Sequence, residues 1–210
     1  MDIEYKGGNC VVLTIKKNVV VVDPKLSDLN LKDQGPNAAV QLLTQPQFGA
    51  PHNEDALVIN GPGEYEVADI SIRGVAARAH MDGPDDGKKA TMYSIVAEDI
   101  SVVVTGHIHP DIAEDQLEAL GMVDVLIVPV GGNGYTLDAK GAVEVIRKID
   151  PKVVIPTHYA DGATSYAVPQ ADLDVFVKEL GATVENSNKL KLKSGVFGDK
   201  LIVQQLNRVA

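Results

Sequence analysis

The amino-acid sequence predicts one domain of mixed α/β class that spans residues 1–210. Short runs rich in valine and isoleucine, bounded by glycine and proline, fill the first half of the chain and are typical of β-strands. In the second half, helical spacing of apolar residues alternates with continuous apolar runs, as in sheets covered by helices. No linker and no repeat of about 20–50 residues divides the chain. The 45% of hydrophobic residues is enough for a sizeable core.

The first half of the chain is predicted to be almost entirely β-structure. Turn signals separate the apolar runs, among them Asn60-Gly61-Pro62-Gly63 and the acidic segment 82–87, which we expect to be a loop tip. The predicted strands lie at residues 10–15, 19–22, 39–43, 56–59, 70–75, 91–96 and 100–104.

The second half is predicted to alternate helices with buried strands. Asp111 reads as the N-cap of a first helix, because Glu114 follows it in the spacing of a capping box, and Gly121 ends that helix. A second helix runs from about residue 139 to Pro151, and a third covers residues 173–180. The predicted strands lie at residues 123–130, 153–156, 190–192 and 201–203.

Charge and composition exclude several classes of function. The chain has 19 Lys and Arg against 29 Asp and Glu, a net charge of −10, and no basic stripe, so a nucleic-acid partner is not expected. Cys10 has no second cysteine to pair with, and we expect it to be buried. The first residues lack the pattern of a signal peptide, and no apolar run reaches the length of a membrane span. We therefore expect a soluble cytoplasmic protein with no membrane partner, a candidate for binding a small molecule and for forming a homo-oligomer.

The histidines are the residues most suggestive of chemistry. His107 and His109 follow the strand 100–104, and His158 follows the strand 153–156, so all three lie where α/β sheets gather their binding groups. An H-x-H pair is a common way to hold zinc, although hydrogen-bonded or surface histidines fit the same pattern and are favoured on the residues alone. His52 and His80 are both expected to face solvent.

Two further segments near these strand ends have alternative interpretations. Asp111 could be a metal ligand, but its place before Glu114 favours the helix cap. The segment Gly131-Gly132-Asn133-Gly134 could cradle a phosphate, yet neither G-x-G-x-x-G nor the lysine of a P-loop is present, so a tight structural turn is favoured. No G-x-S-x-G nucleophile elbow appears.

Four separated blocks of the chain, at residues 21–24, 59–67, 124–132 and 151–159, carry a family resemblance. In their residues and their order they resemble the metallo-β-lactamase superfamily. More narrowly, the chain is similar to its branch of predicted zinc-dependent hydrolases, which includes proteins like ascorbate-6-phosphate lactonase. The resemblance implies a four-layer αβ/βα sandwich with a metal site at one edge between the two sheets.

The family's main zinc motif, T-H-x-H-x-D-H, aligns with Thr44-Gln45-Pro46-Gln47-Phe48-Gly49-Ala50. By this resemblance Gln45 and Gln47 replace two histidines, Gly49 replaces the aspartate and Ala50 replaces the last histidine. Glutamine is a weak zinc ligand, and glycine and alanine supply none.

The remaining ligand positions of the family fall on three histidines. The resemblance puts His107 at the place of the bridging aspartate, keeps the last histidine as His158 and loosely matches the middle histidine to His80. In a rival register, the H-x-H-x-D motif is displaced to residues 107–112, where Ile112 replaces its closing histidine.

Three functions follow from this sequence, in order of preference. The first is a binding or regulatory module, a pseudoenzyme candidate whose standard zinc centre has been dismantled. The second is a metal-dependent hydrolase of small esters, lactones or phosphoesters, with a rearranged site at His107, His158 and either His80 or His109. Asp111 or a water would complete its shell, and zinc or another divalent metal is implied only if this site exists. The third is an oligomeric scaffold.

Overall fold

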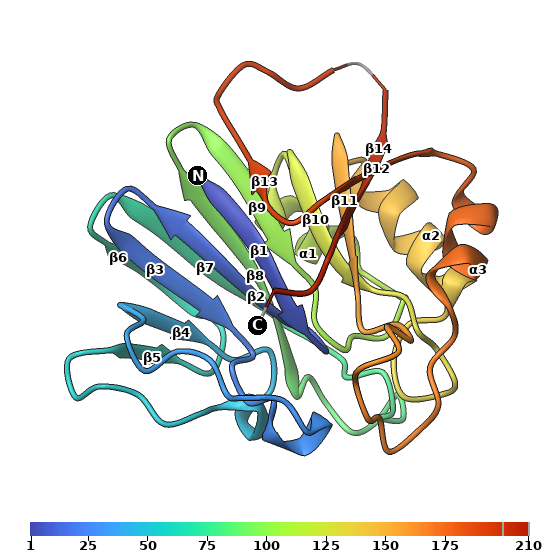
Figure 1. The fold of residues 1–210 in the computed structure, drawn as a ribbon, viewed down its shortest axis with the longest axis horizontal. Coiled ribbons are helices and arrows are strands. Elements are labelled where there is room, and N and C mark those ends of the chain that lie inside the picture. Colours follow the sequence, from blue (N-terminus) through green and yellow to red (C-terminus); the bar gives the residue numbers. More distant parts are fainter. Residues whose placement is uncertain (199, 210) are drawn as a thin grey trace.

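In the computed structural model, which describes residues 1–198 and 200–209, two β-sheets face each other and α-helices cover the outer side of one of them (Figure 1). The mixed α/β fold class predicted from the sequence is confirmed. The two sheets hold fourteen strands among the described residues, and three α-helices and two short 3₁₀ helices accompany them.

The first sheet has six strands in the order β13-β1-β2-β3-β4-β5. The pairs from β13 to β3 are antiparallel, whereas β3-β4 and β4-β5 are parallel. Gly7, at φ +117°, and Gly8, at φ +56°, allow the tight turn between β1 and β2. The strands are β1 (Asp2–Gly7), β2 (Cys10–Ile15), β3 (Asn18–Val22), β4 (Val40–Leu42), β5 (Leu57–Ile59) and β13 (Leu190–Lys191).

The second sheet has eight strands in the order β12-β14-β11-β10-β9-β8-β7-β6. The strands from β12 to β9 are parallel, and β9 to β6 are antiparallel. Strand β14 follows β12 in the chain but lies between β11 and β12. The strands are β6 (Gly63–Val67), β7 (Ile70–Ala77), β8 (Ala90–Ala97), β9 (Ile100–Val104), β10 (Val125–Pro129), β11 (Val153–Thr157), β12 (Thr183–Ser187) and β14 (Ile202–Leu206).

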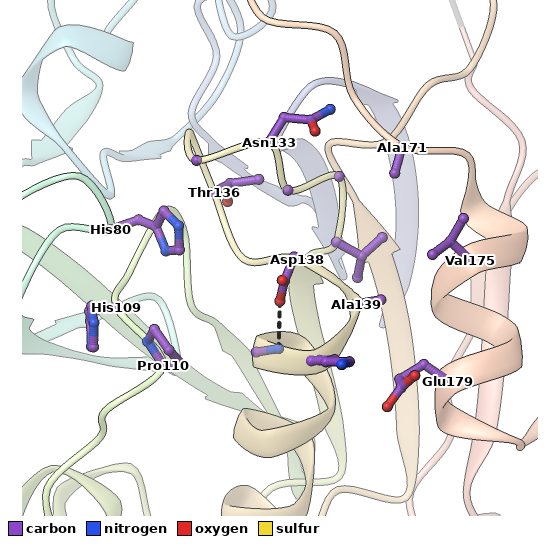
Figure 2. Close-up of a pocket in the computed structure, with 16 residues that line it drawn as sticks. His80, His109, Pro110, Asn133, Thr136, Asp138, Ala139, Ala171, Val175 and Glu179 are labelled. Atoms are coloured by element: carbon purple, nitrogen blue, oxygen red, sulfur yellow. Dashed lines mark hydrogen bonds between the residues drawn. The ribbon is translucent and has the colours of Figure 1, made fainter.

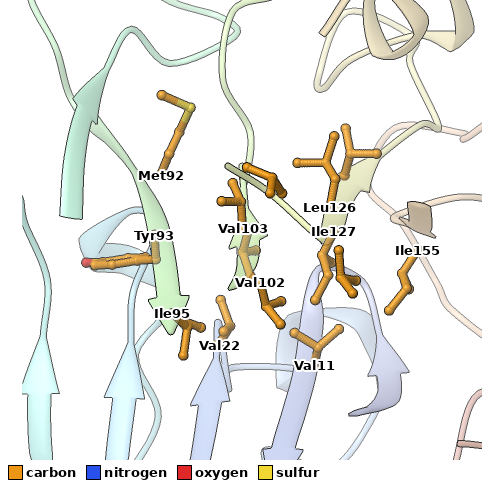
Figure 3. Close-up of a cluster of buried hydrophobic side chains, with 14 of the residues drawn as sticks. Val11, Val22, Met92, Tyr93, Ile95, Val102, Val103, Leu126, Ile127 and Ile155 are labelled. Atoms are coloured by element: carbon orange, nitrogen blue, oxygen red, sulfur yellow. The ribbon is translucent and has the colours of Figure 1, made fainter. Parts of the chain in front are cut away.

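The space between the sheets is filled by aliphatic side chains. Val11 and Val22 of the six-stranded sheet lie opposite Val102 and Ile127 of the eight-stranded sheet (Figure 3), and all four are fully buried. Burying a side chain of this size contributes about 1.5–3 kcal/mol. The valine-rich runs of the sequence therefore form the shared core of both sheets.

The helices are α1 (Glu114–Leu120), α2 (Ala139–Ile149) and α3 (Leu173–Leu180). Helix α2 buries Ala142, Val143 and Ile146, as its spacing predicts, and it also buries Val145. On the outer side of the six-stranded sheet, the segment 24–38 packs Leu26 and Ala38 against Cys10 and Val21. Its helical part is the 3₁₀ helix η1 (Ser27–Leu29), so this layer consists mainly of irregular chain.

The predicted N-cap of the first helix is wrong. Helix α1 begins after Ala113, whose backbone N–H donates to Gln116 Oε1 at 2.9 Å. Asp111 is exposed, and its Oδ1 lies 3.9 Å from Lys148 Nζ. The chain stays extended at Ala113, which moves the helix start two residues beyond the position that the pattern indicated.

Most other sequence predictions agree with the structure. The predicted strands at 10–15, 70–75, 91–96 and 100–104 match β2, β7, β8 and β9 closely, whereas β1, β6 and β12 were not predicted. Cys10 is buried as expected, and burial raises the pKa of its thiol well above the ordinary value. Within residues 1–198 and 200–209, no helix is long and apolar enough to cross a membrane.

Candidate functional site

Two histidines meet where the carboxyl ends of β9 and β11 lie in the eight-stranded sheet. His107 follows β9 and His158 follows β11, and their ring centroids are 4.6 Å apart with the rings nearly perpendicular. The His158 backbone N–H donates to the Gly8 carbonyl at 2.7 Å, and its φ of +51° is unusual for a residue other than glycine. We call His107 and His158 the inner pair.

Aromatic side chains pack around the inner pair. Tyr135 stacks on His158 at 5.3 Å, Tyr166 lies 4.5 Å from the same ring, and Phe48 lies 5.3 Å from His107. The space left among Phe48, Tyr135 and the inner pair is about 80 Å³, which we call the inner cavity. A cavity of this size holds at most a very small ligand or a few waters.

Each inner histidine is hydrogen-bonded through Nδ1. Gln170 Nε2 donates to the Val168 carbonyl, so Gln170 Oε1 is the acceptor for His158 Nδ1–H at 3.1 Å, which leaves a lone pair on His158 Nε2. His107 Nδ1 lies 2.9 Å from Thr136 Oγ1. Burial lowers the pKa of His158 to about 4 and that of His107 well below its ordinary value, so both rings are neutral at pH 7.

A buried carboxylate lies beside the inner pair. Asp23 accepts hydrogen bonds from Asn9 Nδ2 at 2.7 Å, from Thr44 N at 2.8 Å and from Thr44 Oγ1 at 2.6 Å, while Thr157 Oγ1 donates to Asn9 Oδ1. Burial raises the pKa of Asp23 to about 6 despite these donors. This network joins the ends of β3, β4 and β11, so it fixes the two sheets to each other at the site.

The residues that the resemblance aligned with the family's zinc motif lie next to this region. Gln45 precedes the 3₁₀ helix η2 (Pro46–Phe48), Gln47 is exposed, and neither glutamine lines the inner cavity. Gly49 is half-buried and Ala50 is buried. It is Phe48 that this segment directs toward His107.

A larger cavity of about 770 Å³, which we call the outer cavity, is lined on one side by residues 131–134 and Thr136 (Figure 2). His80 and His109, which we call the outer pair, line it with ring centroids 6.4 Å apart. The His80 backbone N–H donates to the His107 carbonyl at 2.8 Å, and Thr136 touches both the outer cavity and the inner pair. His80 is half-buried instead of facing solvent freely as expected, whereas His52 is exposed as predicted.

Backbone groups fix different tautomers in the outer pair. His80 Nδ1–H donates to the Ile108 carbonyl at 3.2 Å, which leaves its Nε2 as an acceptor. His109 Nδ1 instead accepts from the Asp111 backbone N–H at 3.1 Å, so the neutral ring carries its proton on Nε2. Partial burial lowers the pKa of both rings, and the charge of Arg78 acts in the same direction.

The donor set does not fit the dinuclear zinc centre that the family resemblance implies. Among residues 1–198 and 200–209, no three side chains of His, Cys, Asp or Glu gather closely enough to hold a metal ion. The four candidate histidines form two separate pairs, and His109 has no free lone pair in its present tautomer. A catalytic zinc ion ordinarily takes three protein ligands, and the inner pair supplies two.

Several important side chains at this site were not singled out from the sequence. Tyr135 and Thr136 directly follow the glycine-rich segment after β10, and this position at a strand end was the one available signal. Phe48 reaches His107 from a distant part of the chain, and Gln170 reaches His158 from the loop that precedes α3. Asp23 ends a valine run, but its burial depends on contacts that the sequence does not display.

Comparison with known proteins identifies the family and the fold. A family model described as a beta-lactamase superfamily domain matches residues 2–158. A candidate Zn-dependent hydrolase of the metallo-beta-lactamase superfamily from Thermotoga maritima superposes with a TM-score of 0.74 and 26% identity, covering 98% of this chain and 100% of that one.

Curated relatives that match the chain by sequence include UPF0173 metal-dependent hydrolases. A UPF0173 metal-dependent hydrolase of Carboxydothermus hydrogenoformans is 38% identical over 60 residues, 29% of this chain and 24% of that relative. The match to this relative thus spans about a quarter of its length. A UPF0173 metal-dependent hydrolase of Natranaerobius thermophilus is 25% identical over 86% of this chain and 91% of that relative.

Proposed function

The chain belongs to the beta-lactamase superfamily, and from this premise we propose that it is a small-molecule binding or regulatory module that does not use the family's dinuclear zinc chemistry. Zinc hydrolysis needs a held metal with an open position that activates a bound water. The segment 44–50 carries two glutamines, a glycine and an alanine where the motif has its ligands. The proposal therefore assigns recognition, and not hydrolysis, to the ends of the strands.

The observation that carries this proposal is the packing around the inner pair. Phe48 and Tyr135 occupy the space beside His107 and His158. Burial lowers the pKa of both imidazoles, which are therefore neutral at pH 7. Within the described part of the chain, no third His, Cys, Asp or Glu side chain gathers with them closely enough to hold a metal ion, and the nearby Asp23 is hydrogen-bonded to Asn9 and Thr44. An arrangement of this kind stabilises the fold at the sheet edge, and it leaves the outer cavity as the space for a ligand.

The outer cavity has the size and lining of a ligand site. Its volume of about 770 Å³ lies within the range of about 300–1,000 Å³ that small-molecule pockets occupy. Backbone of the glycine-rich loop forms one side, and polar side chains of His80, His109 and Asp138 converge on it with the apolar Val175. The proposal places the ligand here.

Metal content is the direct test. Untagged protein, together with His107→Ala and His158→Ala, is analysed by plasma mass spectrometry after zinc, manganese or iron has been offered and removed by desalting. The exposed His52→Ala is the matched control. We expect well under one equivalent of metal in all four proteins. Stoichiometric metal that is lost in both inner-pair variants and kept in His52→Ala would overturn the proposal.

A second candidate is a hydrolase of small esters, lactones or phosphoesters with a rearranged metal site. The observation that favours it is a pair of hydrogen bonds. His158 is bonded through Nδ1 to Gln170, and His80 is bonded through Nδ1 to the Ile108 carbonyl, so each ring keeps a free lone pair on Nε2. Metal-binding histidines usually have this arrangement. If bound, a metal would supply an activated water, and His107, His158 and His80 would be its holders.

The same metal measurement separates the two candidates, and a substrate screen extends it. If the protein retains metal, esters, lactones and phosphoesters are assayed for turnover that disappears in His158→Ala. Turnover without metal, or metal without turnover on any of these classes, would contradict this second candidate.

A further inference from the structure

We infer that the outer cavity recognises a small organic amine that also carries a hydroxyl group. This inference rests on the proposed function, because it names the class of ligand for the same site. It is carried by two groups of side chains on opposite sides of the cavity: the paired imidazoles of His80 and His109 on one side, and the carboxylates of Asp138 and Glu179 toward α2 and α3 (Figure 2).

The imidazole side is suited to a hydroxyl group. The hydrogen bond from His80 to Ile108 makes Nε2 of His80 an acceptor, and the bond from Asp111 to His109 makes Nε2 of His109 a donor. A hydroxyl group both donates and accepts, so one ligand oxygen can bind either ring with its correct partner. Backbone atoms of Ile108 and Asp111 hold these tautomers, so the fold itself fixes one acceptor on His80 and one donor on His109.

The opposite side is suited to a positive charge. Among the lining residues, Asp138 and Glu179 supply two carboxylates and Lys140 supplies one ammonium group, so acidic side chains outnumber basic ones. The net charge of −10 on the chain also favours the approach of cations. A ligand ammonium can bind a carboxylate here through a charge-assisted hydrogen bond.

An anionic ligand is disfavoured by the same lining. The start of α2 would ordinarily attract an anion through its free backbone N–H groups. Here Asp138 Oδ1 already accepts from the Gly141 N–H at 2.8 Å, and the Asp138 carboxylate would repel a second anion. Val175 and Pro110 add apolar surface, which favours an organic cation over a bare ammonium ion.

Tyramine tests this inference because it carries a phenol hydroxyl and an ammonium on one small frame. Calorimetric titration compares it with 4-ethylphenol, which lacks the ammonium, with phenethylamine, which lacks the hydroxyl, and with 3-(4-hydroxyphenyl)propionate, which carries a carboxylate. We expect tyramine to bind at least about tenfold more tightly than either 4-ethylphenol or phenethylamine, and the carboxylate to bind least. Equal affinities across the series, or no tyramine binding at millimolar concentration, would overturn the inference.

Variants locate the two contacts. Asp138→Asn keeps the helix cap, since asparagine is a good N-cap, and together with Glu179→Gln it should remove the preference for tyramine over 4-ethylphenol. Lys140→Gln is the matched control, and it should leave the affinity for tyramine unchanged or increase it. Nitrogen-15 NMR of the backbone follows folding in each variant and should show tyramine shifts at Gly132 and Gly134. Retention of the preference in Asp138→Asn with Glu179→Gln would overturn the assignment of the charge contact.

Metal analysis of the same samples separates this inference from the proposed function. Metal-free protein that fails to bind tyramine overturns the ligand class alone. Protein that holds stoichiometric metal and binds tyramine with the expected preference supports the ligand class and overturns the metal-free module.

Discussion

The inner pair and the outer pair use the same side chain in two different ways. His107 and His158 are about 3% and 4% exposed, lie against aromatic rings and are hydrogen-bonded to side chains. His80 and His109 line a cavity about ten times larger and are hydrogen-bonded to backbone groups. The contrast teaches that histidines at the ends of strands act according to what surrounds them. The proposed function follows this contrast: it gives the closely packed inner pair a structural role and places the ligand beside the outer pair.

The largest effect should come from crowding the inner pair. In Gly131→Ala the added Cβ would lie 2.1 Å from the His158 carbonyl oxygen and 2.4 Å from Gln170 Oε1, so the loop after β10 must move. We expect a loss of at least about 3 kcal/mol in the free energy of unfolding, measured by urea denaturation. Gly134→Ala, on the side of the outer cavity, meets open space and should lose only about 1 kcal/mol through its left-handed φ. Similar losses in the two variants would remove the contrast between the regions.

Acid should weaken the protein chiefly through the inner pair. The pKa of His158 falls from an ordinary 6.5 to about 4 on folding, so the unfolded chain binds more protons between these values. The free energy of unfolding should therefore be unaffected by this group above pH 6.5 and should fall by on the order of 3 kcal/mol as the pH drops to 4. His158→Asn, which tolerates the positive φ, should flatten this loss relative to the wild type.

The control for this pH series is His80→Asn in the outer pair, which should retain the loss. Asp23 acts in the opposite direction, because its raised pKa of about 6 makes its contribution to stability fall as the pH rises from 3.8 to 6. Since Asp23 is present in every variant, it cancels in the comparison. An unchanged acid loss in His158→Asn would show that His158 is not the buried neutral group described above.

A smaller effect should follow from removing the Thr136 hydroxyl. Thr136→Val keeps the shape of the side chain but leaves His107 Nδ1 without its partner at 2.9 Å, which should cost about 1–2 kcal/mol. Thr136→Ser retains the hydroxyl and should cost less. Urea denaturation measures the free energy of unfolding of both variants. If the outer pair is independent of the inner pair, the nitrogen-15 shifts of the His80 ring should stay constant in both. A Thr136→Val protein as stable as the wild type would contradict the role given to this hydrogen bond.

The elements that the sequence predicted well are those with local signals. The continuous apolar character of β10 and the helical spacing of α2 appear in neighbouring residues, so periodicity alone reveals them. Strands β1, β6 and β12 mix charged with apolar residues and are only partly buried, and so they lack that signal. Their pairing depends on partners far away in the chain.

The same distinction applies to the candidate site: residues with a local signal were predictable, and contacts between separate segments were not. His107 and His158 could be found because each directly follows an apolar run that ends in the sheet. Their protonation and their contacts could not, because Phe48, Tyr135 and Gln170 approach them from separate segments. The helix cap assigned to Asp111 failed for a related reason, since the side chain of Gln116 satisfies the first N–H group from inside the helix.

The position of β14 has a consequence for how the protein is assembled during synthesis. Strand β11 pairs with β10 on one side and with β14 on the other, and β12 joins the sheet only through β14. A ribosome therefore completes β11 and β12 while the outer edge of β11 is still unpaired, and that edge stays open until residues 202–206 emerge. Chains stalled before this point would present an unpaired strand edge, which is the kind of surface that promotes aggregation.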